Sequence, residues 1–328
     1  MSDDTIRRRL ITIPVTVVLF LVVSVCFPVL VTASLLVDSM RAVLWRTPAV
    51  ASRLIVFLWL YLLGEMWALV ALAGAGLLTS ERSVGLTYRL QGAWAAWTFE
   101  SMRAAFSLSF REEGLEHVPP APILVLARHA SLVDTMLPAR YVTRAHGIRL
   151  RYVLKKELLI DPALDIGGNR LPNHFVDRGA AAAEAEVTAI QALAEGMADS
   201  EGVMIYPEGT RYSDEKRERY VAPLVRQGGI IGEIASRYEK VLPPRPGGTL
   251  ALLDATSADV VVLAHRGLEG FATLKDIWSR DLVGSRIDVR LWRVPRSDIP
   301  EGRSQRVEWL YRIWADIDAW VSEKRHVG

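Results

Sequence analysis

The sequence contains almost no cysteine, since Cys26 is the single one among 328 residues. One thiol excludes an intramolecular disulfide and a cysteine metal cluster, and it suits a reducing cytoplasm. The six histidines form no His-x-x-x-His pair of the kind that binds zinc on a helix. The sequence therefore predicts no resident metal and argues against a metal hydrolase.

Two sequence motifs of enzymes and a long run of basic residues are also missing. No Gly-x-Ser-x-Gly stretch is present, which argues against the nucleophile elbow of an esterase or lipase. No Gly-x-x-x-x-Gly-Lys loop is present for a nucleoside triphosphate. The 39 basic residues are nearly balanced by 37 acidic ones, and no long Lys/Arg block occurs. We therefore expect no nucleic-acid partner, and any anion site must be local.

Long apolar runs, in contrast, are concentrated before residue 80. Hydrophobic residues make up 51% of the chain and the mean hydropathy is +0.20. Residues 11–37 carry no charge and are long enough to cross a bilayer, and residues 54–78 are interrupted only by Glu65. The two runs predict a membrane hairpin. The cost of Glu65 in lipid indicates a partner on the first helix or a position close to the headgroups.

The flanks of the two runs are basic. Arg7, Arg8 and Arg9 precede the first run, as they would in a signal peptide, but the run is too long and no convincing cleavage site closes it. Four residues between the runs favour the membrane interface: Arg41, Trp45, Arg46 and Arg53. We expect an N-terminal membrane hairpin over 1–80 and a main domain over 81–328.

In the main domain, short apolar runs alternate with helical patterns. This alternation predicts an α/β fold in which a central sheet is flanked by helices. A loop or linker is expected over 243–248, and helices over 180–196 and 303–324. The expected strands are 123–127, 150–154, 174–176, 203–206, 260–264 and 287–294.

Residues 88–110 form a helical pattern rich in aromatic side chains: Trp94, Trp97, Phe99 and Phe106. Contact with the membrane is one interpretation. Packing on the core of the main domain is favoured, because apolar stripes at helical spacing are usually core.

The first candidate for chemistry is His129, followed five positions later by Asp134. His129 follows a strand end and can serve as a general base, while Asp134, in the first turn of the next helix, can fix its tautomer. A purely structural alternative exists, in which Ser131 caps a helix and Asp134 completes a carboxylate version of the capping box. The spacing alone does not exclude that alternative.

The second candidate is the stretch Tyr206-Pro207-Glu208-Gly209-Thr210-Arg211. A buried strand enters a turn where Gly209 permits close approach of the backbone, and Thr210 and Arg211 offer neutral and bidentate donors. These groups suit a phosphate monoester. The structural alternative is a glycine turn that carries a surface arginine.

The two stretches together resemble the glycerolipid acyltransferases of the lysophosphatidate acyltransferase type, whose patterns are Asn-His-x-x-x-x-Asp and Phe-Pro-Glu-Gly-Thr-Arg. The resemblance covers roughly residues 110–320. Beyond Arg211 it depends on looser patterns, Leu242-Pro-Pro-Arg245 and Trp309-Leu310, which are similar to the longer eukaryotic-type lysophospholipid acyltransferases. The resemblance implies that Glu208 shapes the loop or meets the glycerol of the acceptor. It also implies a mixed central sheet and an acyl chain that enters along the membrane face.

Two further stretches match the family more weakly. Phe175-Val176-Asp177-Arg178 precedes a helix, where Arg178 would add charge to a phosphate site. Lys155 and Lys156 are similar to a basic pair of the family and are candidates for acceptor or coenzyme A phosphates. The alternatives are a plain N-cap by Asp177 and solvated lysines.

The chain departs from the family at two positions. Arg128 replaces the usual Asn, where it would lower the affinity of the neighbouring histidine for a proton or contact the acceptor, and Tyr206 replaces the usual Phe.

The resemblance implies a transferase that moves an acyl group from acyl-CoA or acyl carrier protein to 1-acylglycerol 3-phosphate, making phosphatidate, with no cofactor beyond the donor. Its partners would be membrane lipids, the lysophospholipid and the donor. The main domain would lie on the cytoplasmic face of the cell membrane. The alternatives are another acceptor, such as lysophosphatidylinositol or lysocardiolipin, and a non-catalytic membrane-binding descendant.

Overall fold

The computed structural model describes residues 3–176, 183–269, 271–279 and 282–323. Its contacts divide the chain into two compact units. The first contains Met1–Ser109, Leu154–Asp177 and Ile277–Ser285, and the second contains Phe110–Val153, Arg178–Asp276 and Arg286–Gly328. The division into a hairpin over 1–80 and a main domain over 81–328 stays a prediction.

The first unit is mainly helical. α1 and α2 form an antiparallel hairpin in which the rings of Phe27 and Trp59 lie 5.0 Å apart and Trp59 Nε1 donates to Ser24 Oγ at 3.1 Å. The helices and strand of this unit are α1 (Asp3–Trp45), α2 (Ala51–Ala75), α3 (Ser80–Ala105), η4 (Lys156–Ile160), α4 (Pro162–Arg170) and β4 (His174–Val176).

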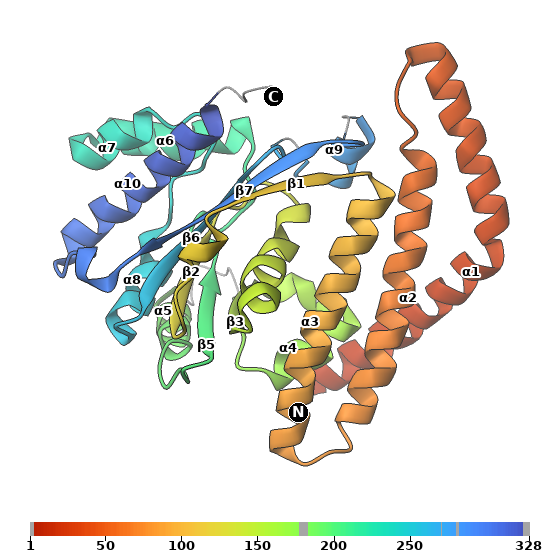
Figure 1. The fold of residues 1–328 in the computed structure, drawn as a ribbon, viewed down its shortest axis with the longest axis horizontal. Helices are drawn as coiled ribbons and strands as arrows, with labels where there is room; N and C mark the ends of the chain where they lie inside the picture. Colours follow the sequence, from red (N-terminus) through yellow and green to blue (C-terminus); the bar gives the residue numbers. More distant parts are fainter. Residues whose placement is uncertain (1–2, 177–182, 270, 280–281, 324–328) are drawn as a thin grey trace. The chain divides into compact units, whose positions relative to one another are not determined.

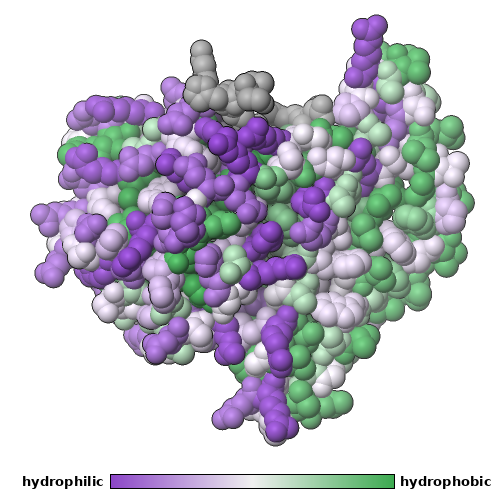
Figure 2. All heavy atoms as spheres, viewed as in Figure 1, coloured by the Kyte–Doolittle hydropathy of each residue, from purple (hydrophilic) through white to green (hydrophobic). Residues whose placement is uncertain are grey.

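Both hairpin helices are long and apolar enough to cross a membrane, judged by length and composition. In their most apolar windows only 11% and 22% of the residues are buried, whereas a core helix of a soluble protein would bury most of them. Figure 2 shows the hydrophobic surface that gathers over these helices. The two apolar N-terminal helices are therefore consistent with association with a membrane.

The turn of the hairpin is shorter than expected, because α1 continues to Trp45 and only residues 46–50 are not helical. Residues 38–45 contain no glycine or proline that would end the helix. Asp38 on α1 closes the turn: its carboxylate accepts the backbone N–H groups of Val50, Ala51 and Ser52 at 2.8–3.0 Å and the hydroxyl of Ser52 at 2.6 Å. Asp38 thus caps the first turn of α2 from the neighbouring helix.

The aromatic face of α3 packs on α2. Trp97 Nε1 donates to the carbonyl of Leu60 at 2.8 Å, and the ring of Phe106 lies 6.1 Å from that of Phe57. For Trp97 the expectation of packing on the core of the main domain is therefore wrong, because its indole bonds α2. Glu65 of α2 also bonds α3, because Trp94 Nε1 donates to Glu65 Oε1 at 2.8 Å. The partner expected on the first helix therefore lies on α3.

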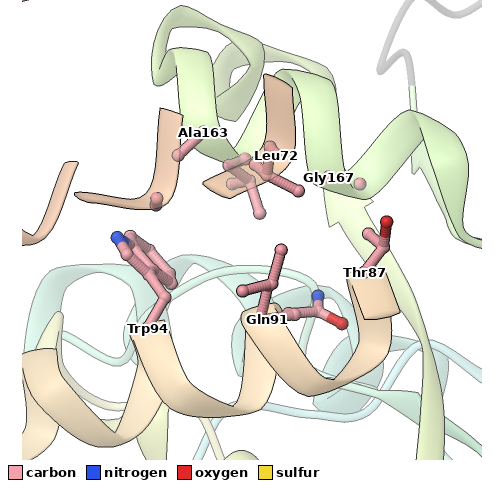
Figure 3. Close-up of a pocket in the computed structure, with 10 residues that line it drawn as sticks. Leu72, Thr87, Gln91, Trp94, Ala163 and Gly167 are labelled. Carbon is pink, nitrogen blue, oxygen red and sulfur yellow. The ribbon is translucent and has the colours of Figure 1, made fainter. Parts of the chain in front are cut away.

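A small pocket lies among α2, α3 and α4. Figure 3 shows Thr87, Gln91 and Trp94 of α3 facing Leu72 of α2, with Ala163 and Gly167 of α4 beside them. Its volume of about 20 Å³ holds roughly one water molecule. It is a small gap in the packing of these three helices.

Ion pairs hold the start of α1 to α4. Arg8 Nη2 lies 2.9 Å from Asp165 Oδ1, and Arg9 Nε lies 3.1 Å from Asp165 Oδ2. The Asp165 side chain is fully buried while the arginines are about a quarter exposed. Burial would raise the pKa of Asp165, but the hydrogen bonds and charges of Arg8 and Arg9 outweigh it and hold that pKa below its usual value.

The seven strands form one sheet in the order β1-β7-β6-β2-β5-β3-β4 (Figure 1). β2 pairs in parallel with β5 and β6, and β3 with β5, whereas β7 runs antiparallel to β6. The predicted α/β class with a mixed central sheet is confirmed. Besides β4, the strands are β1 (Ser109–Glu113), β2 (Ile123–Ala127), β3 (Arg149–Lys155), β5 (Glu201–Ile205), β6 (Asp259–Arg266) and β7 (Arg286–Val294).

Helices cover the sheet within the second unit. α5 packs against α8, α6 against α7, and α10 against both α7 and α8 (Figure 1). The helical elements of the second unit are η1 (Leu115–His117), η2 (Val133–Met136), the π-helical η3 (Ala139–Arg144), α5 (Ala183–Ala192), α6 (Asp214–Gln227), α7 (Gly229–Ser236), α8 (Pro246–Ala255), η6 (Arg296–Asp298) and α10 (Arg303–Ser322), and α9 (Leu274–Ser279) is divided between the two units.

All six predicted strands are confirmed within one or two residues, and β1 was not predicted, because its polar sequence shows no apolar run. The loop expected over 243–248 is wrong in its second half. Pro246 begins α8, where the fixed φ of proline suits the first helical turn. A Cβ at Gly248 would lie 2.9 Å from Ile205 Cδ1, so a larger residue there would displace the end of that side chain.

Candidate active site

His129 lies at the carboxyl end of β2, between the parallel neighbours β5 and β6. All five residues of β2 are buried, as expected for a strand covered on both faces. The backbone of Arg128 still pairs with Leu263 of β6, and the chain then leaves the sheet. The central position of β2 thus places His129 where the loops after three parallel strands meet.

His129 and Asp134 form a hydrogen-bonded pair. His129 Nδ1 lies 2.9 Å from Asp134 Oδ1, and the two side chains are 8% and 1% exposed. An ionised carboxylate only accepts, so Nδ1 carries the proton and the lone pair is on Nε2. Within the described residues no hydrogen-bond partner is recorded for His129 Nε2, which is therefore available to a ligand.

Asp134 is held ionised by its surroundings. Burial would raise its pKa, but the charge and hydrogen bond of His129, with a further contribution from His265, outweigh burial and hold the pKa well below its usual value. The backbone N–H groups of Ala130 and Ser131 also donate to Asp134 Oδ2, at 2.6 and 2.7 Å.

The structural alternative for this motif is partly present in the same geometry. Ser131 Oγ accepts the N–H of Val133 at 3.1 Å while Asp134 accepts that of Ser131, which is a reciprocal pair of the capping-box kind, but Leu132 and not Ser131 is the N-cap of η2. The backbone N–H of Ser131 donates to Asp134 Oδ2, whereas Nδ1 of His129 donates to Asp134 Oδ1. One carboxylate therefore caps the turn and orients His129 at once.

Tyr206 packs over the imidazole. The two rings are stacked with centroids 4.3 Å apart, and the Tyr206 hydroxyl donates to the carbonyl of Asp134 at 3.3 Å. The hydroxyl, absent from the usual phenylalanine, thus ties the strand β5 to η2 and restricts rotation of the His129 ring.

Glu208 links three segments around the site. Its Oε1 accepts the backbone N–H of His129 at 3.1 Å and Nε1 of Trp314 at 3.3 Å, while Oε2 accepts the N–H of Leu242 at 3.4 Å. The side chain is buried, and burial raises the pKa of Glu208 to about 8 although Arg128 and these hydrogen bonds act in the opposite direction. This geometry favours a loop-shaping role over contact with the acceptor.

The loop after Glu208 carries the candidate phosphate donors. Gly209 has φ +67°, and a Cβ there would lie 3.3 Å from Arg245 Cδ, so the turn requires glycine. Thr210 is 9% exposed and its hydroxyl accepts Lys216 Nζ at 3.2 Å. Arg211 Nη1 is buried and has no hydrogen-bond partner in the described part of the chain. A buried guanidinium nitrogen with no partner is suited to an anion.

The two motifs are joined directly. The N–H of Tyr212 donates to the carbonyl of His129 at 2.9 Å, and behind them Ala130, Tyr212 and Leu242 form a buried cluster. The structure therefore brings together six of the predicted site residues in the second unit: His129, Asp134, Glu208, Gly209, Thr210 and Arg211.

Three other predicted site residues stay predictions. Arg178 lies outside the described residues. Lys155 ends β3 and Lys156 begins η4, both within the first unit. Among the described residues no cluster of His, Cys, Asp and Glu side chains has the arrangement of a metal site.

Arg128 does not contact an acceptor, because its side chain is fully buried and engaged. Nη1 donates to the carbonyl of His265 at 2.6 Å and lies 2.5 Å from Glu269 Oε1, while Nη2 donates to the carbonyl of Lys240 at 2.6 Å. Arg128 thus joins the end of β2 to the end of β6 and to the segment before α8.

Sequence patterns missed two residues near the site. Lys216 lies on α6 and donates to the hydroxyl of Thr210. Its place beside the candidate phosphate donors follows only from the structure, because Lys216 belongs to no motif. His265 belongs to none of the motifs in the sequence, but its Nε2 lies 3.2 Å from Asp134 Oδ2. The one local signal for it is the strand β6, whose parallel pairing with β2 places its end beside His129.

Comparison with known proteins agrees with this arrangement. Residues 109–263 match the family model described as Acyltransferase. The chain is also similar to the crystal structure of the 1-acyl-sn-glycerophosphate (LPA) acyltransferase PlsC from Thermotoga maritima, with a TM-score of 0.55 and 15% sequence identity, over 84% of this chain and 98% of that chain. No curated protein matches the sequence.

The family match and the fold support an acyltransferase. The likeness to PlsC, at 15% identity, is a likeness of fold.

Proposed function

We propose that the chain is a 1-acylglycerol-3-phosphate O-acyltransferase, which makes phosphatidate from a lysophospholipid and an acyl-CoA or acyl carrier protein donor. The observation that carries the proposal is the pair of His129 and Asp134, joined through Tyr212 to the loop that bears Arg211. Among the residues that the structure describes, His129 Nε2 and Arg211 Nη1 have no hydrogen-bond partner. A base and an anion site in one buried setting are what acyl transfer to a phosphorylated alcohol requires.

In the proposed reaction His129 Nε2 takes the proton of the acceptor hydroxyl as the oxygen attacks the thioester carbonyl. The new ester bond forms, the carbon–sulfur bond breaks, and the departing thiolate receives the proton from the imidazolium. Asp134 holds the proton on Nδ1 and stabilises the imidazolium that forms in between. No covalent acyl-enzyme intermediate is needed.

The phosphate of the acceptor would lie against Thr210 and Arg211. The buried Nη1 of Arg211 supports this placement, as does the cationic Lys216 beside Thr210. Arg178, Lys155 and Lys156 remain candidates for the same phosphate or for those of coenzyme A.

The experiment is an acceptor panel with purified protein, in which release of free coenzyme A from acyl-CoA is followed. Lysophosphatidate is expected to be the best acceptor, ahead of glycerol 3-phosphate, lysophosphatidylinositol and lysocardiolipin. Replacement of the base, His129→Ala, is expected to lower kcat/KM for lysophosphatidate by at least roughly 100-fold. His117→Gln, at an exposed position, is the matched control.

Transfer to lysophosphatidylinositol or lysocardiolipin in preference to lysophosphatidate would reassign the acceptor. A His129→Ala protein with wild-type turnover would contradict the mechanism. Absence of acyl transfer with every acceptor would favour a non-catalytic membrane-binding role.

We also propose that the protein resides at the cell membrane with its catalytic residues on the cytoplasmic face. Acyl-CoA is cytosolic, and the three arginines before the first apolar run favour a cytoplasmic N-terminus. The apolar, largely exposed hairpin supports the membrane assignment.

A further inference from the structure

His265 shares the carboxylate of Asp134 with His129. His265 lies on β6, is fully buried, and its Nε2 lies 3.2 Å from Asp134 Oδ2. The same nitrogen lies 3.2 Å from the carbonyl oxygen of Arg128. Two imidazoles therefore flank one carboxylate, with His129 on Oδ1 and His265 on Oδ2.

The hydrogen-bond partners fix the tautomer of His265. A carbonyl oxygen and an ionised carboxylate both accept, so Nε2 carries a proton and donates to them. Nδ1 is buried and has no hydrogen-bond partner within the described residues. A proton on Nδ1 would be buried without an acceptor, so the stable form of His265 is the neutral ring with its proton on Nε2.

Arg128 holds this second histidine in place. Its Nη1 donates to the backbone carbonyl of His265 at 2.6 Å, and the backbone carbonyl of Arg128 receives the His265 ring. The charge of Arg128 is paired with Glu269. Burial would raise the pKa of Glu269, but the charge of Arg128 outweighs burial and the pKa is lowered. The arginine that stands where the family has asparagine is thus part of the support of His265.

We propose that His265 is a positioning residue for acyl transfer, which holds Asp134 against His129 and sets how strongly the catalytic imidazole retains a proton. This inference rests on the proposed function of His129. With His265 donating to Oδ2, part of the charge of Asp134 is already compensated, so the carboxylate attracts a proton on His129 less strongly. His129 then releases its proton more readily to the departing thiolate.

The other charged or titratable groups around His129 do not replace this contact. Tyr206 covers the ring, and Glu208 accepts the backbone N–H and not the side chain. Further groups of the described residues near the pair are Arg128 and Glu269.

The test is the pH dependence of kcat/KM for lysophosphatidate in His265→Leu, His265→Gln and His265→Asn. Leucine removes the donor. Glutamine places an amide N–H close to the position of Nε2, whereas the shorter asparagine does not reach Asp134. We expect His265→Leu and His265→Asn to lower kcat/KM by roughly 10-fold and to move the acidic limb to higher pH by about half a unit or more. His265→Gln should restore the wild-type limb.

A second readout does not depend on turnover. The rate at which diethyl pyrocarbonate modifies His129, followed by peptide mass spectrometry as a function of pH, reports the protonation of His129 itself. The same upward shift is expected for leucine and asparagine and none for glutamine or for the exposed control His117→Gln.

Identical His129 protonation curves for the glutamine and asparagine variants would overturn the inference, even if both lose activity, because a merely structural role does not distinguish them by pH. If His265→Leu does not fold, the comparison of glutamine with asparagine alone decides. Failure of the proposed function is recognised separately: His129→Ala then remains active, while the modification experiment still reports on His265.

Discussion

At the residue scale, the site combines groups that are close in the chain with groups that are not. His129 and Asp134 were predictable from the sequence because a turn of five residues brings them together whatever the rest of the fold does. His265 and Lys216 were not, because their roles depend on which strands are neighbours in the sheet and on where α6 begins. Arg128 was identified as unusual, but its contact with His265 follows only from the structure.

The unpartnered nitrogen of Arg211 leads to a prediction about the acceptor. Arg211→Ala should cost about 2 to 4 kcal/mol of transition-state stabilisation with a phosphate-bearing acceptor, the range for loss of a buried charge pair. Arg211→Lys should recover only part of it, because a point charge does not reproduce the bidentate fork. The measurement is kcat/KM with lysophosphatidate and with a monoacylglycerol, which lacks phosphate.

The monoacylglycerol rate should change far less in Arg211→Ala, and the exposed Arg219→Ala on α6 serves as a control for loss of charge. Equal losses with both acceptors would assign Arg211 a structural role.

At the element scale, regular segments were predicted best where one face or both faces are apolar. β2 and β4 match their predicted bounds because Ile123–Ala127 and His174–Val176 are bounded by polar or turn residues. β1 was missed because an edge strand with the sequence Ser-Phe-Arg-Glu-Glu lacks an apolar pattern. The length of α1 was underestimated because the predicted run, 11–37, stops where charged residues begin. An α-helix can include charged residues where water or a partner such as Asp165 is available, and α1 therefore extends beyond the uncharged stretch at both ends.

The cap of α2 by Asp38 gives a prediction for the hairpin. Asp38→Ala removes the acceptor of three backbone N–H groups and should lower the free energy of unfolding of the hairpin by about 1 to 2 kcal/mol, as loss of an N-cap does. Thermal unfolding in detergent, followed by the fluorescence of Trp59 and its neighbours, measures the change. Ser39→Ala is the control, because Ser39 is exposed and bonds only the carbonyl of Leu35. Equal midpoints for both variants would show that water replaces the carboxylate without cost.

At the scale of the whole molecule, the disposition of the hairpin decides how the chain meets a bilayer. Both ends of the hairpin contact segments outside it: Arg8 and Arg9 pair with Asp165, while Arg41 at the opposite end donates to the carbonyl of Trp278 at 3.2 Å and lies over its ring at 4.3 Å. A hairpin that spans the bilayer would carry one of its ends across roughly 30 Å of hydrocarbon. These contacts therefore support a hairpin that enters one leaflet and returns.

Labelling tests this disposition. In a Cys26→Ser background, a cysteine at Ser39 should be protected from an impermeant thiol reagent added to intact cells and should react after lysis. Ser39 is preferred to Ser52, because the Ser52 hydroxyl bonds Asp38 and its replacement would disturb the turn. Reaction of Ser39→Cys from outside would mean two full crossings. A cysteine at Ser322, near the C-terminus, reports the side of the main domain, and its reaction from outside would contradict the cytoplasmic assignment.

The pairing of Arg8 and Arg9 with Asp165 also sets an order of events during synthesis. The partners are 156 and 157 residues apart, so a ribosome that adds about 5 to 20 residues per second makes Asp165 roughly 8 to 30 seconds after the arginines. Throughout that interval Arg8 and Arg9 lie beside the apolar run of the nascent α1 without the carboxylate of Asp165, and their charges can orient the run as it enters the bilayer. Once α4 has been made, the buried carboxylate neutralises much of that charge. Arg8 and Arg9 would therefore first orient α1 in the bilayer and later, through their ion pairs with Asp165, hold its start against α4.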